Sequence, residues 1–335
     1  MGYEDLEFED GSLFLVTGGA GFIGSNLCEA ILSMGYKVRC LDDLSTGKQE
    51  NVDLFIDNEN YSFIKGDIRD LDTCMEACKG VDFVLHEAAW GSVPRSIEMP
   101  LFYEEVNIRG TLNMLEAARQ QGVKKFVYAS SSSVYGLNKK VPYSTEDKVD
   151  NPVSLYAATK KSNELMAHSY SKLYGIPVTG LRFFTVYGPA GRPDMAYFGF
   201  TNKLVKGEKI QIFNYGNMSR DFTYIDDIIT GVMDVMRKTP DETEDGVKYK
   251  VYNIGNNQPE SLLNFVETLE KCLIEEGIIN SPAEKELLPM QPGDVYQTYA
   301  DVTDLVNDFG FKPSTSIEEG LSKFAKWYKE FYMNK

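Results

Sequence analysis

Apolar and polar positions in the first 190 residues alternate between the two-residue period of strands and the 3.6-residue period of helices. The opening run, SLFLVTGGAGFIGSNLCEAILSMGYKVRCLDD, indicates a strand, a glycine turn, a helix and a second strand that ends in acids. Further strands are predicted in YSFIKGDI, VDFVLHEAA, KFVYASSSSVYG and VTGLRFFTVYG, with helices between them in LDTCMEACKG, 101–121 and 154–174. Strands that alternate with helices predict a parallel, doubly wound sheet.

The pattern is less regular after Gly188. A loop, a short strand in KIQIF and a helix from Ile225 to about Lys238 are predicted, and KYKVYNIG indicates a late return to the main sheet. SLLNFVETLEKCLIEEG, VTDLVNDFG and SIEEGLSKFAKWYKEFY predict three more helices. We therefore expect an α/β protein with a cleft between two units. The first is a Rossmann-like doubly wound parallel sheet in residues 1–185 with a returning segment at about 222–256. The second is a smaller, interdigitated α+β substrate-binding lobe formed by 186–221 and 257–335.

Composition and charge exclude several classes of function. The 335 residues are 43% apolar and 25% charged, which is ordinary for a globular protein. A net charge of −16 disfavours nucleic acids and anionic lipids as partners. No apolar run approaches the roughly 20 residues that span a bilayer, and the first ten residues carry acids where a signal peptide carries bases. We expect a soluble, cytoplasmic protein. Five cysteines without a Cys-x-x-Cys pair and only two histidines predict reduced core thiols and no metal site.

A glycine fingerprint follows the first strand. Gly18, Gly21 and Gly24 come directly after Leu13 to Thr17 and open the predicted helix. In this context the first glycine allows a tight turn, the second lets the backbone approach a pyrophosphate, and the third permits close packing of helix and strand. Asp42 ends the second strand and is placed to accept hydrogen bonds from a ribose diol. An acid there repels a 2′-phosphate, so the sequence predicts NAD rather than NADP.

Tyr156 and Lys160 lie four residues apart in SLYAATKK, on one face of a predicted helix. A phenol with a pKa of roughly 10 is a poor base at neutral pH, but a lysine cation and a nicotinamide cation both favour the phenolate. Tyr156 is therefore a candidate general base. The serines from Ser130 to Ser133 end an upstream strand, where a parallel sheet places its ligands, and can supply a hydroxyl that shares the substrate proton.

At this point the chain resembles the extended short-chain dehydrogenases/reductases, within their nucleotide-sugar epimerase and dehydratase branch. The resemblance covers nearly the whole length and is carried by GGAGFIG, LDDLSTG, GDIRD, HEAA, VNIRGTLNMLEAA, SSSSVYG, YAATK, LRFFTVYGP, SRDFTYIDD and YNIG. It implies that Ser131, Tyr156 and Lys160 are catalytic. It also implies a set of positions that contact NAD, namely Gly18, Gly21, Phe22, Ile23, Gly24, Asp42, Ser45, Gly47, Asp67, Ile68, Ala88, Ala89, Tyr156 and Lys160.

Two polar residues keep two interpretations each. Asp67 either binds the adenine amino group or caps the next local turn, because Asp favours both kinds of position. Asn107 lies inside a predicted helix, where Asn is a mediocre helix former. The resemblance gives Asn107 a structural or water-holding role near the site, which differs little from that of a buried, hydrogen-bonded Asn.

The residues beside the catalytic hydroxyl indicate the reaction. Dehydrating and decarboxylating relatives carry an acid there, whereas this chain has Ser132 and Ser133. Without a positioned acid a 4-keto intermediate is expected to be reduced again, so the resemblance implies 4-epimerisation with NAD that remains bound. The region after Gly188 is similar to UDP-glucuronate 4-epimerases, which implies interconversion of UDP-glucuronate and UDP-galacturonate. The residues implied for substrate binding are Ser92, Ser132, Ser133, Thr185, Arg192, Phe213, Arg220 and Asp294.

Two alternatives remain open. GSVPRSI, which contains Ser92, is more similar to epimerases of UDP-N-acetylglucosamine or its uronate, and Thr298 leaves room for an N-acetyl group. An NAD-binding sensor without catalysis is the alternative of another class, because a fold does not fix a function. The resemblance further implies a homodimer built on the tyrosine-bearing helix and the long helix that precedes it.

Overall fold

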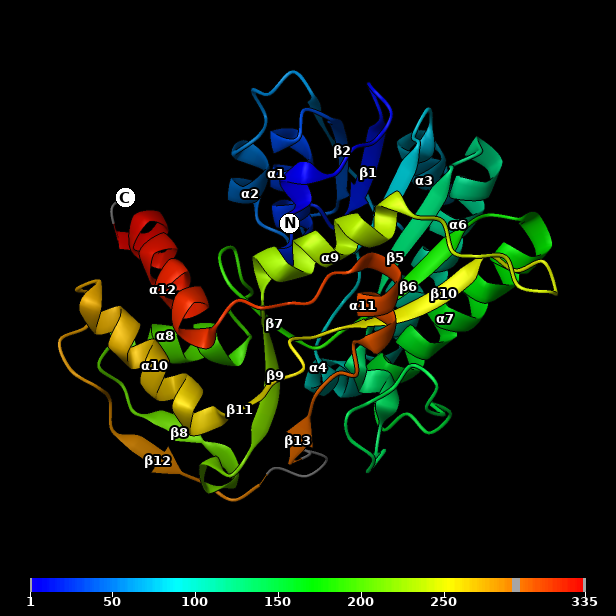
Figure 1. Ribbon diagram of the computed structural model, residues 1–335. Helices are drawn as coiled ribbons and strands as arrows, with labels where there is room; N and C mark the ends of the chain where they lie inside the picture. Colours follow the sequence, from blue (N-terminus) through cyan, green and yellow to red (C-terminus); the bar gives the residue numbers. More distant parts are fainter. Residues whose placement is uncertain (1, 291–295, 334–335) are drawn as a thin grey trace.

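The main sheet has seven strands, all parallel. The computed structural model describes residues 2–290 and 296–333. The strand order is β10-β6-β5-β4-β1-β2-β3 (Figure 1), which confirms the predicted doubly wound sheet and the late return of β10. The strands are β1 Leu13–Thr17, β2 Lys37–Asp42, β3 Tyr61–Lys65, β4 Phe83–His86, β5 Lys125–Ser131, β6 Val178–Phe183 and β10 Tyr249–Ile254. The strand order reverses its direction between β1 and β4. In sheets of this kind ligands bind at such a point, next to the carboxyl ends of the strands.

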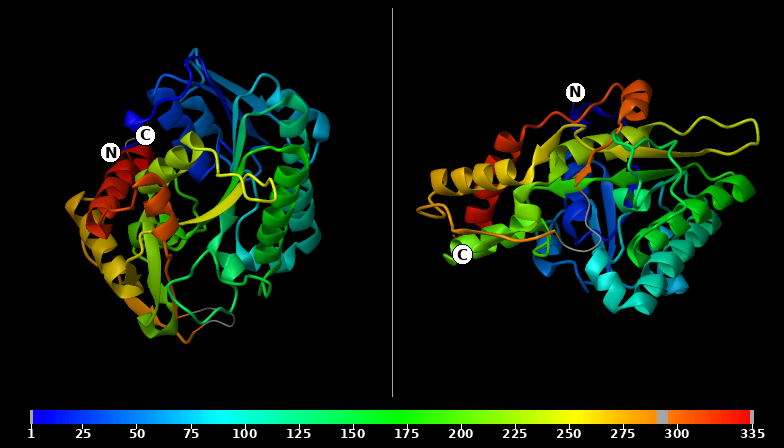
Figure 2. Two further views of the ribbon diagram at one scale, coloured as in Figure 1. Left: turned by 45° about the vertical axis from the view of Figure 1, so that its right-hand side comes forward. Right: turned by 90° about the horizontal axis from the view of Figure 1, so that it is seen from below.

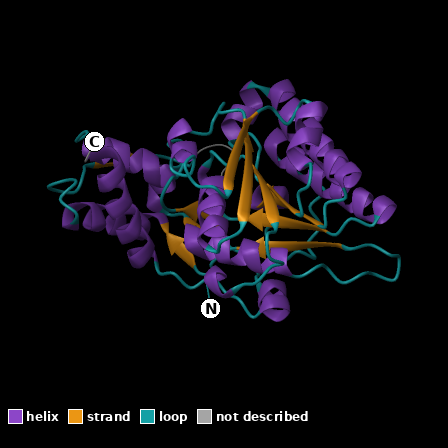
Figure 3. Ribbon diagram, turned by 90° about the horizontal axis from the view of Figure 1, so that it is seen from above, coloured by secondary structure: helices purple, strands orange, loops and turns teal. Residues whose placement is uncertain are grey.

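Helices cover both faces of this sheet (Figure 3). Successive side chains of β1 point to opposite faces, so that Phe14 and Val16 belong to one apolar cluster and Leu15 to the other. The first cluster includes α1 and α9, and the second includes α3, α6 and α7. The helices are α1 Phe22–Ser33, α3 Leu71–Cys78, α6 Gly110–Gln121, α7 Leu155–Tyr174, α9 Ile225–Arg237 and α11 Thr303–Phe309.

The predicted helix 101–121 is divided in three. It consists of α5 (Pro100–Tyr103), a π-helical turn (Glu104–Arg109) and α6. Such single π turns are frequent at functional sites, because the wider turn re-aims one side chain. Asn107 lies within this turn. Two more short helices, α2 (Gln49–Asp53) and α4 (Val93–Glu98), lie in the loops that follow β2 and β4.

The smaller unit is built around β9 (Figure 1). Strands β7, β11 and β13 all pair with β9, and β8 pairs with β12. The single strand predicted in VTGLRFFTVYG is divided at Phe184, because β6 belongs to the main sheet and β7 to this second sheet. The elements are β7 Thr185–Tyr187, α8 Ala196–Val205, β8 Ile210–Ile212, β9 Ser219–Tyr224, β11 Pro259–Ser261, α10 Leu262–Glu275, β12 Lys285–Leu287, β13 Gln297–Thr298 and α12 Ile317–Tyr328.

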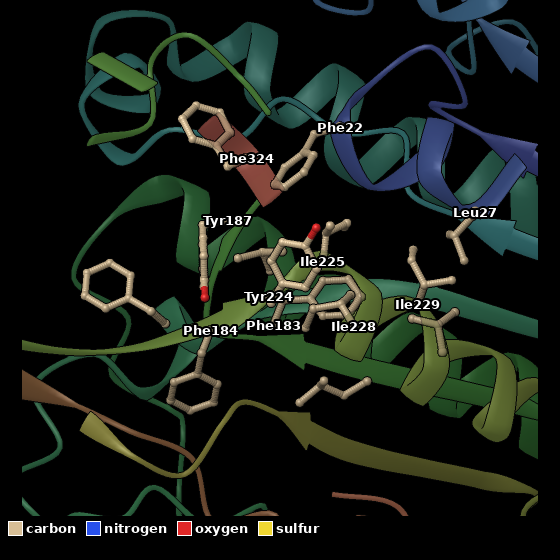
Figure 4. Close-up of a cluster of buried hydrophobic side chains, with 14 of the residues drawn as sticks. Phe22, Leu27, Phe183, Phe184, Tyr187, Tyr224, Ile225, Ile228, Ile229 and Phe324 are labelled. Atoms are coloured by element: carbon tan, nitrogen blue, oxygen red, sulfur yellow. The ribbon is translucent and has the colours of Figure 1, made fainter. Parts of the chain in front are cut away.

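One apolar cluster joins the two units. Figure 4 shows Phe22 and Leu27 of α1, the isoleucines of α9, and Tyr187, Tyr224 and Phe324 of the smaller unit around the same core. Removing such apolar surface from water contributes roughly 25 cal/mol per Å². The units therefore share a core instead of being joined by a linker. Within the described ranges, no helix has the length and apolar character needed to cross a membrane.

Candidate active site

A cavity of about 670 Å³ opens at the carboxyl ends of β1, β2, β4 and β5 and extends toward the smaller unit. Its walls include the glycine turn after β1, the ends of β4 and β5, the start of α7 and the loop around Arg192. The size lies within the usual range for small-molecule sites, about 300–1,000 Å³. The arrangement places the predicted cofactor and catalytic residues around one space.

Glycine is required at two positions, one in the turn after β1 and one in the first turn of α1. Gly18 has φ +70°, and a Cβ atom there would lie 2.8 Å from the backbone nitrogen of Ala88. A Cβ atom on Gly24 would overlap the carbonyl oxygen of Gly18. Gly21 is the N-cap of α1, and Gly21 and Phe22 line the cavity. The positive end of the helix dipole therefore points into the cavity, as an anion-binding turn requires.

Asp42 is held rigidly at the end of β2. Its Oδ2 accepts a hydrogen bond from the Ala20 amide at 3.0 Å, and its Oδ1 accepts one from the Leu44 amide at 2.8 Å. Burial raises the pKa of Asp42, against the lowering effect of these two hydrogen bonds. A Cβ atom on Gly47 would lie 2.8 Å from Oδ1, so Gly47 leaves the space that this carboxylate occupies. Asp42 lines the cavity, and each carboxylate oxygen can accept further hydrogen bonds.

Asp67 both caps a local turn and faces the cavity. Its Oδ1 accepts a hydrogen bond from the Arg69 amide at 2.8 Å, and its Oδ2 accepts one from Arg69 Nε at 2.8 Å. Burial acts to raise the pKa of Asp67, but the hydrogen bonds from Arg69 outweigh it and hold the pKa below the ordinary value. The carboxylate is thus ionised and locally satisfied while it lines the cavity.

Tyr156 and Lys160 meet beneath the cavity as their spacing predicts. Helix α7 begins after Ser154, whose hydroxyl accepts a hydrogen bond from the Ala157 amide at 3.1 Å. The Lys160 Nζ donates to the carbonyl oxygen of Ala129 in β5 at 2.8 Å and lies 6.0 Å from the centre of the Tyr156 ring. Ser131 at the end of β5 completes the group, and all three residues line the cavity.

The electrostatic environment leaves the Tyr156 phenol protonated at neutral pH. Burial raises the pKa of Tyr156, while hydrogen bonding with Ser131 and the charge of Arg192 act to lower it. Burial also lowers the pKa of Lys160 to about 8, and the Glu87 carboxylate opposes that change. A further positive charge brought by a bound group would favour the phenolate, which is the form that accepts a proton.

A buried ion pair supports the catalytic group from behind. Glu164, one helical turn after Lys160, accepts hydrogen bonds from the Ser130 hydroxyl at 2.7 Å and from Arg182 Nε at 2.8 Å. Arg182 in turn donates to the Tyr135 hydroxyl at 3.0 Å. These contacts join α7, β5 and β6 next to Ser131. Sequence reasoning did not identify Glu164 or Arg182; the spacing of Glu164 after Lys160 was the available signal.

Two motifs from distant parts of the sequence meet at the other end of the cavity. Asp194 accepts a hydrogen bond from Arg192 Nε at 3.0 Å and lies 3.6 Å from the Arg95 guanidinium. A Cβ atom on Gly91 would overlap the end of the Arg192 side chain, so a larger residue at position 91 would displace this guanidinium. Ser92 has φ +107°, a strained conformation of the kind that clusters at binding sites. GSVPRSI and GRPDM therefore form one wall.

Asn107 is a buried, hydrogen-bonded side chain, which both of its interpretations allow. Its Oδ1 accepts a hydrogen bond from the Trp90 amide at 2.8 Å, and its Nδ2 donates to the Trp90 carbonyl oxygen and the Thr159 hydroxyl, each at 3.1 Å. Asn107 thereby links Trp90, which directly precedes GSVPRSI, to Thr159 of α7.

The cavity brings together most of the residues predicted from the sequence. Those that line it are Gly18, Gly21, Phe22, Ile23, Gly24, Asp42, Ser45, Asp67, Ile68, Ala88, Ala89, Ser92, Ser131, Ser133, Tyr156, Lys160 and Arg192. Gly47, Ser132, Thr185, Phe213 and Arg220 are not among its lining residues. Thr185 lies between two lining residues, Phe184 and Val186, whereas Phe213 follows β8 and Arg220 lies in β9, farther into the smaller unit. Asp294 lies outside the described residues.

The five cysteines are buried and unpaired. Among residues 2–290 and 296–333, no group of three or more His, Cys, Asp or Glu side chains is arranged to hold a metal ion.

Comparison with known proteins finds relatives that match nearly the whole chain. Residues 14–255 match the family described as the NAD dependent epimerase/dehydratase family. The chain is 40% identical to the probable UDP-glucuronate 4-epimerase of Rhizobium meliloti, over 95% of this chain and 97% of that protein. A crystal structure of UDP-glucuronic acid 4-epimerase from Bacillus cereus, in complex with UDP-glucuronic acid and NAD, has a TM-score of 0.84 and 35% identity and covers 96% of this chain and 100% of that one. A UDP-N-acetylglucosamine 4-epimerase from Methanobrevibacter ruminantium M1, in complex with UDP-N-acetylmuramic acid, has a TM-score of 0.86 and 32% identity, with coverage of 96% and 99%.

Proposed function

Because the chain belongs to the NAD-dependent epimerase/dehydratase family, we propose that it is a UDP-glucuronate 4-epimerase. In this proposal it interconverts UDP-glucuronate and UDP-galacturonate through a 4-keto sugar. The residues present fit NAD, since side chains at Gly18 and Gly24 would fill the cradle after β1 and Asp42 stands where a ribose diol is bound.

The chain's own residues handle the proton. NAD, when bound, supplies a reversible acceptor for the hydride of carbon 4. Tyr156 takes the proton of the 4-hydroxyl group on its phenolate oxygen, and the Ser131 hydroxyl bonds to the same oxygen of the sugar. The Lys160 ammonium stabilises the phenolate. After the 4-keto sugar presents its other face, Tyr156 returns the proton to the oxygen on carbon 4 and is again a phenolate, so the chain gains and loses no proton overall.

Arg192 is the residue on which we base the proposal that the sugar is a uronate. It lines the same cavity as Ser131, Ser133 and Tyr156, and places a guanidinium there in a chain of net charge −16. A guanidinium binds a carboxylate more strongly than it binds a neutral hydroxymethyl group. The Rhizobium and Bacillus proteins named above support the same sugar.

One observation favours a second candidate, a 4-epimerase of UDP-N-acetylglucosamine or its uronate. Ser92, from the motif that resembles such enzymes, lines the cavity beside Arg95. The Methanobrevibacter structure is of an enzyme with that name. Thr298 is the other residue that suggested an N-acetyl sugar. It lies in β13, where it pairs with Arg220 of β9, and it does not line the cavity.

Separate incubation with UDP-glucuronate and UDP-N-acetylglucosamine, followed by chromatography of the sugars, decides between the candidates. We expect UDP-galacturonate from the first and little turnover of the second. Arg192→Gln removes a hydrogen bond to a charged group, worth about 1.5–3 kcal/mol, and should raise KM for UDP-glucuronate by about 10- to 100-fold. Arg237→Gln, at the far end of α9, is the matched control. Turnover of the N-acetyl sugar alone would overturn the uronate proposal, and turnover of neither sugar would favour an NAD sensor.

We also propose a homodimer formed through α6 and α7, which lie together on the side of the molecule away from the smaller unit (Figure 2). Leu112 of α6 and Leu165 and Leu173 of α7 are 39%, 59% and 69% exposed. Apolar side chains gathered on a helix pair are typical of an interface between subunits.

Light scattering should therefore give twice the chain mass of 37.7 kDa. Replacement of both Leu165 and Leu173 by Glu is expected to give the monomer mass, because charges are excluded from the centre of such interfaces. Leu287→Glu, at a 49% exposed leucine of the smaller unit, should leave the mass unchanged. A monomer in the unmodified protein would contradict the proposal.

A further inference from the structure

Glu87 is a cavity residue that the mechanism above does not use. It directly follows β4, and its amide donates to the Thr17 carbonyl oxygen of β1 at 3.1 Å. The residue lines the cavity together with Tyr156 and Lys160. Its position is therefore fixed by the main sheet at the point where the catalytic helix α7 begins.

One oxygen of this carboxyl group is buried without a partner. Glu87 Oε1 is inaccessible to solvent and receives no hydrogen bond from any of the described residues. A buried polar atom without a partner costs about 1–3 kcal/mol, and in native proteins such atoms call for a functional explanation. This oxygen therefore does not stabilise the fold by hydrogen bonding, and the residue lines the same cavity as Tyr156 and Lys160.

Lys160 of α7 is the charged group whose effect lowers the pKa of Glu87, against the larger effect of burial, which raises it. Its Nζ donates to the carbonyl oxygen of Ala129 at 2.8 Å, and Ala129 follows Tyr128, the β5 residue that pairs with His86, the residue before Glu87. Burial raises the pKa of the Tyr156 phenol and the Glu87 carboxylate also raises it, so the direct effect of Glu87 on Tyr156 opposes the phenolate. His86, the preceding residue of β4, is neutral, because burial and then the charge of Lys160 lower its pKa to about 3. Its ring is hydrogen-bonded between the Thr17 and Thr111 hydroxyls. The facing cavity residues of β5, from Ala129 to Ser131, carry no charge.

We propose that Glu87 is a positioning residue that keeps Lys160 charged and so sets the alkaline limit of activity. This inference rests on the roles proposed for Tyr156 and Lys160. The ionised carboxylate attracts the ammonium group, and the ammonium group stabilises the phenolate that accepts the substrate proton. Glu87 acts on the reaction through Lys160 and not by contact with the reacting atoms.

The direction of the pH effect follows from the two groups. Burial raises the pKa of Glu87 to about 7, against the effect of Lys160, so this carboxyl group is neutral in mildly acidic solution and charged in mildly alkaline solution. Burial lowers the pKa of Lys160 to about 8, and the Glu87 charge opposes that loss. Without the carboxylate, Lys160 loses its proton at a lower pH. Glu87 therefore matters above about pH 7 and has little effect below about pH 6.

The kcat profile between about pH 5.5 and 9.5 tests this inference, with whichever of the two UDP-sugars is turned over. For Glu87→Gln we expect rates near those of the unmodified protein below pH 6 and an alkaline decline displaced to lower pH by about one unit. Glu87→Asp keeps the charge and should restore much of the alkaline limb. Glu146→Gln, at an exposed loop glutamate, is the matched control. An equal loss at every pH, or an unchanged profile, would overturn the inference.

A second measurement separates this inference from the proposed function. Acetic anhydride modifies an amine only when the amine is unprotonated, and mass spectrometry of the Lys160 peptide reports the extent of modification at each pH. The midpoint for Lys160 should lie at lower pH in Glu87→Gln than in the unmodified protein and in Glu146→Gln. A displaced midpoint with no turnover of either sugar would leave the role of Glu87 supported and the proposed function wrong. An unmoved midpoint would overturn the role of Glu87 whatever the activity.

Discussion

Tyr156→Phe is expected to lower kcat by about 10²- to 10⁴-fold, the usual contribution of a general acid or base. The substitution removes the phenolic oxygen alone and leaves the ring 6.0 Å from Lys160 Nζ in place. NAD content and the midpoint of thermal unfolding should change little, because the cradle after β1 lies on another element. The measurement is the initial rate of epimer formation, with bound NAD determined on the same sample.

Tyr170→Phe is the control on the same helix. Its hydroxyl lies 3.1 Å from Glu116 and is not part of the cavity, so activity should be retained. A Tyr156→Phe protein with more than a tenth of the original kcat would show that another group moves the proton.

Gly24→Ala is expected to remove bound NAD from the purified protein and, with it, most activity. A Cβ atom at this position would overlap the Gly18 carbonyl oxygen, so that α1 must shift away from the turn that faces the pyrophosphate. A shift that costs 1.4 kcal/mol of binding lowers affinity about tenfold, and loss of close helix packing is expected to cost more. Bound NAD released by denaturation and titration with added NAD measure the effect.

Gly199→Ala is the matched control, because Gly199 lies in α8 with only one atom, the Pro193 carbonyl oxygen, at 4.0 Å from its Cβ position. Alanine is the better helix former, so this change should stabilise the protein by about 0.5–1 kcal/mol. Full NAD content in the Gly24→Ala protein would refute the cradle assigned to the glycine turn.

The parts of the fold that the sequence predicts well are those specified by neighbouring residues. Helix α7 occupies Leu155–Tyr174, within one residue of its predicted limits, because its cap, apolar face and following glycine lie in one stretch. The division at Phe184 was not predicted. β6 and β7 belong to different sheets, and the apolar pattern is the same in both. Sheet membership depends on partners far away in the chain.

The same distinction applies to the candidate site. The glycine turn and the Tyr156–Lys160 pair are local patterns, and the structure places both in the cavity. Glu87 and the Glu164–Arg182 pair were missed because their importance arises from burial and from partners on other elements. Phe213 and Arg220 were selected from neighbouring motifs, and they do not line the cavity because β8 and β9 carry them farther into the smaller unit.

Two loops that are far apart in the sequence contact each other in the cavity wall, so a change in one alters the contacts of the other. Arg192 occupies the space above Gly91, and Asp194 is shared with Arg95. A graft of 189–195 that replaces Arg192 or Asp194 would leave Gly91 without the side chain that lies above it, or Arg95 without its carboxylate partner. A chimera that takes both loops from one parent keeps these contacts.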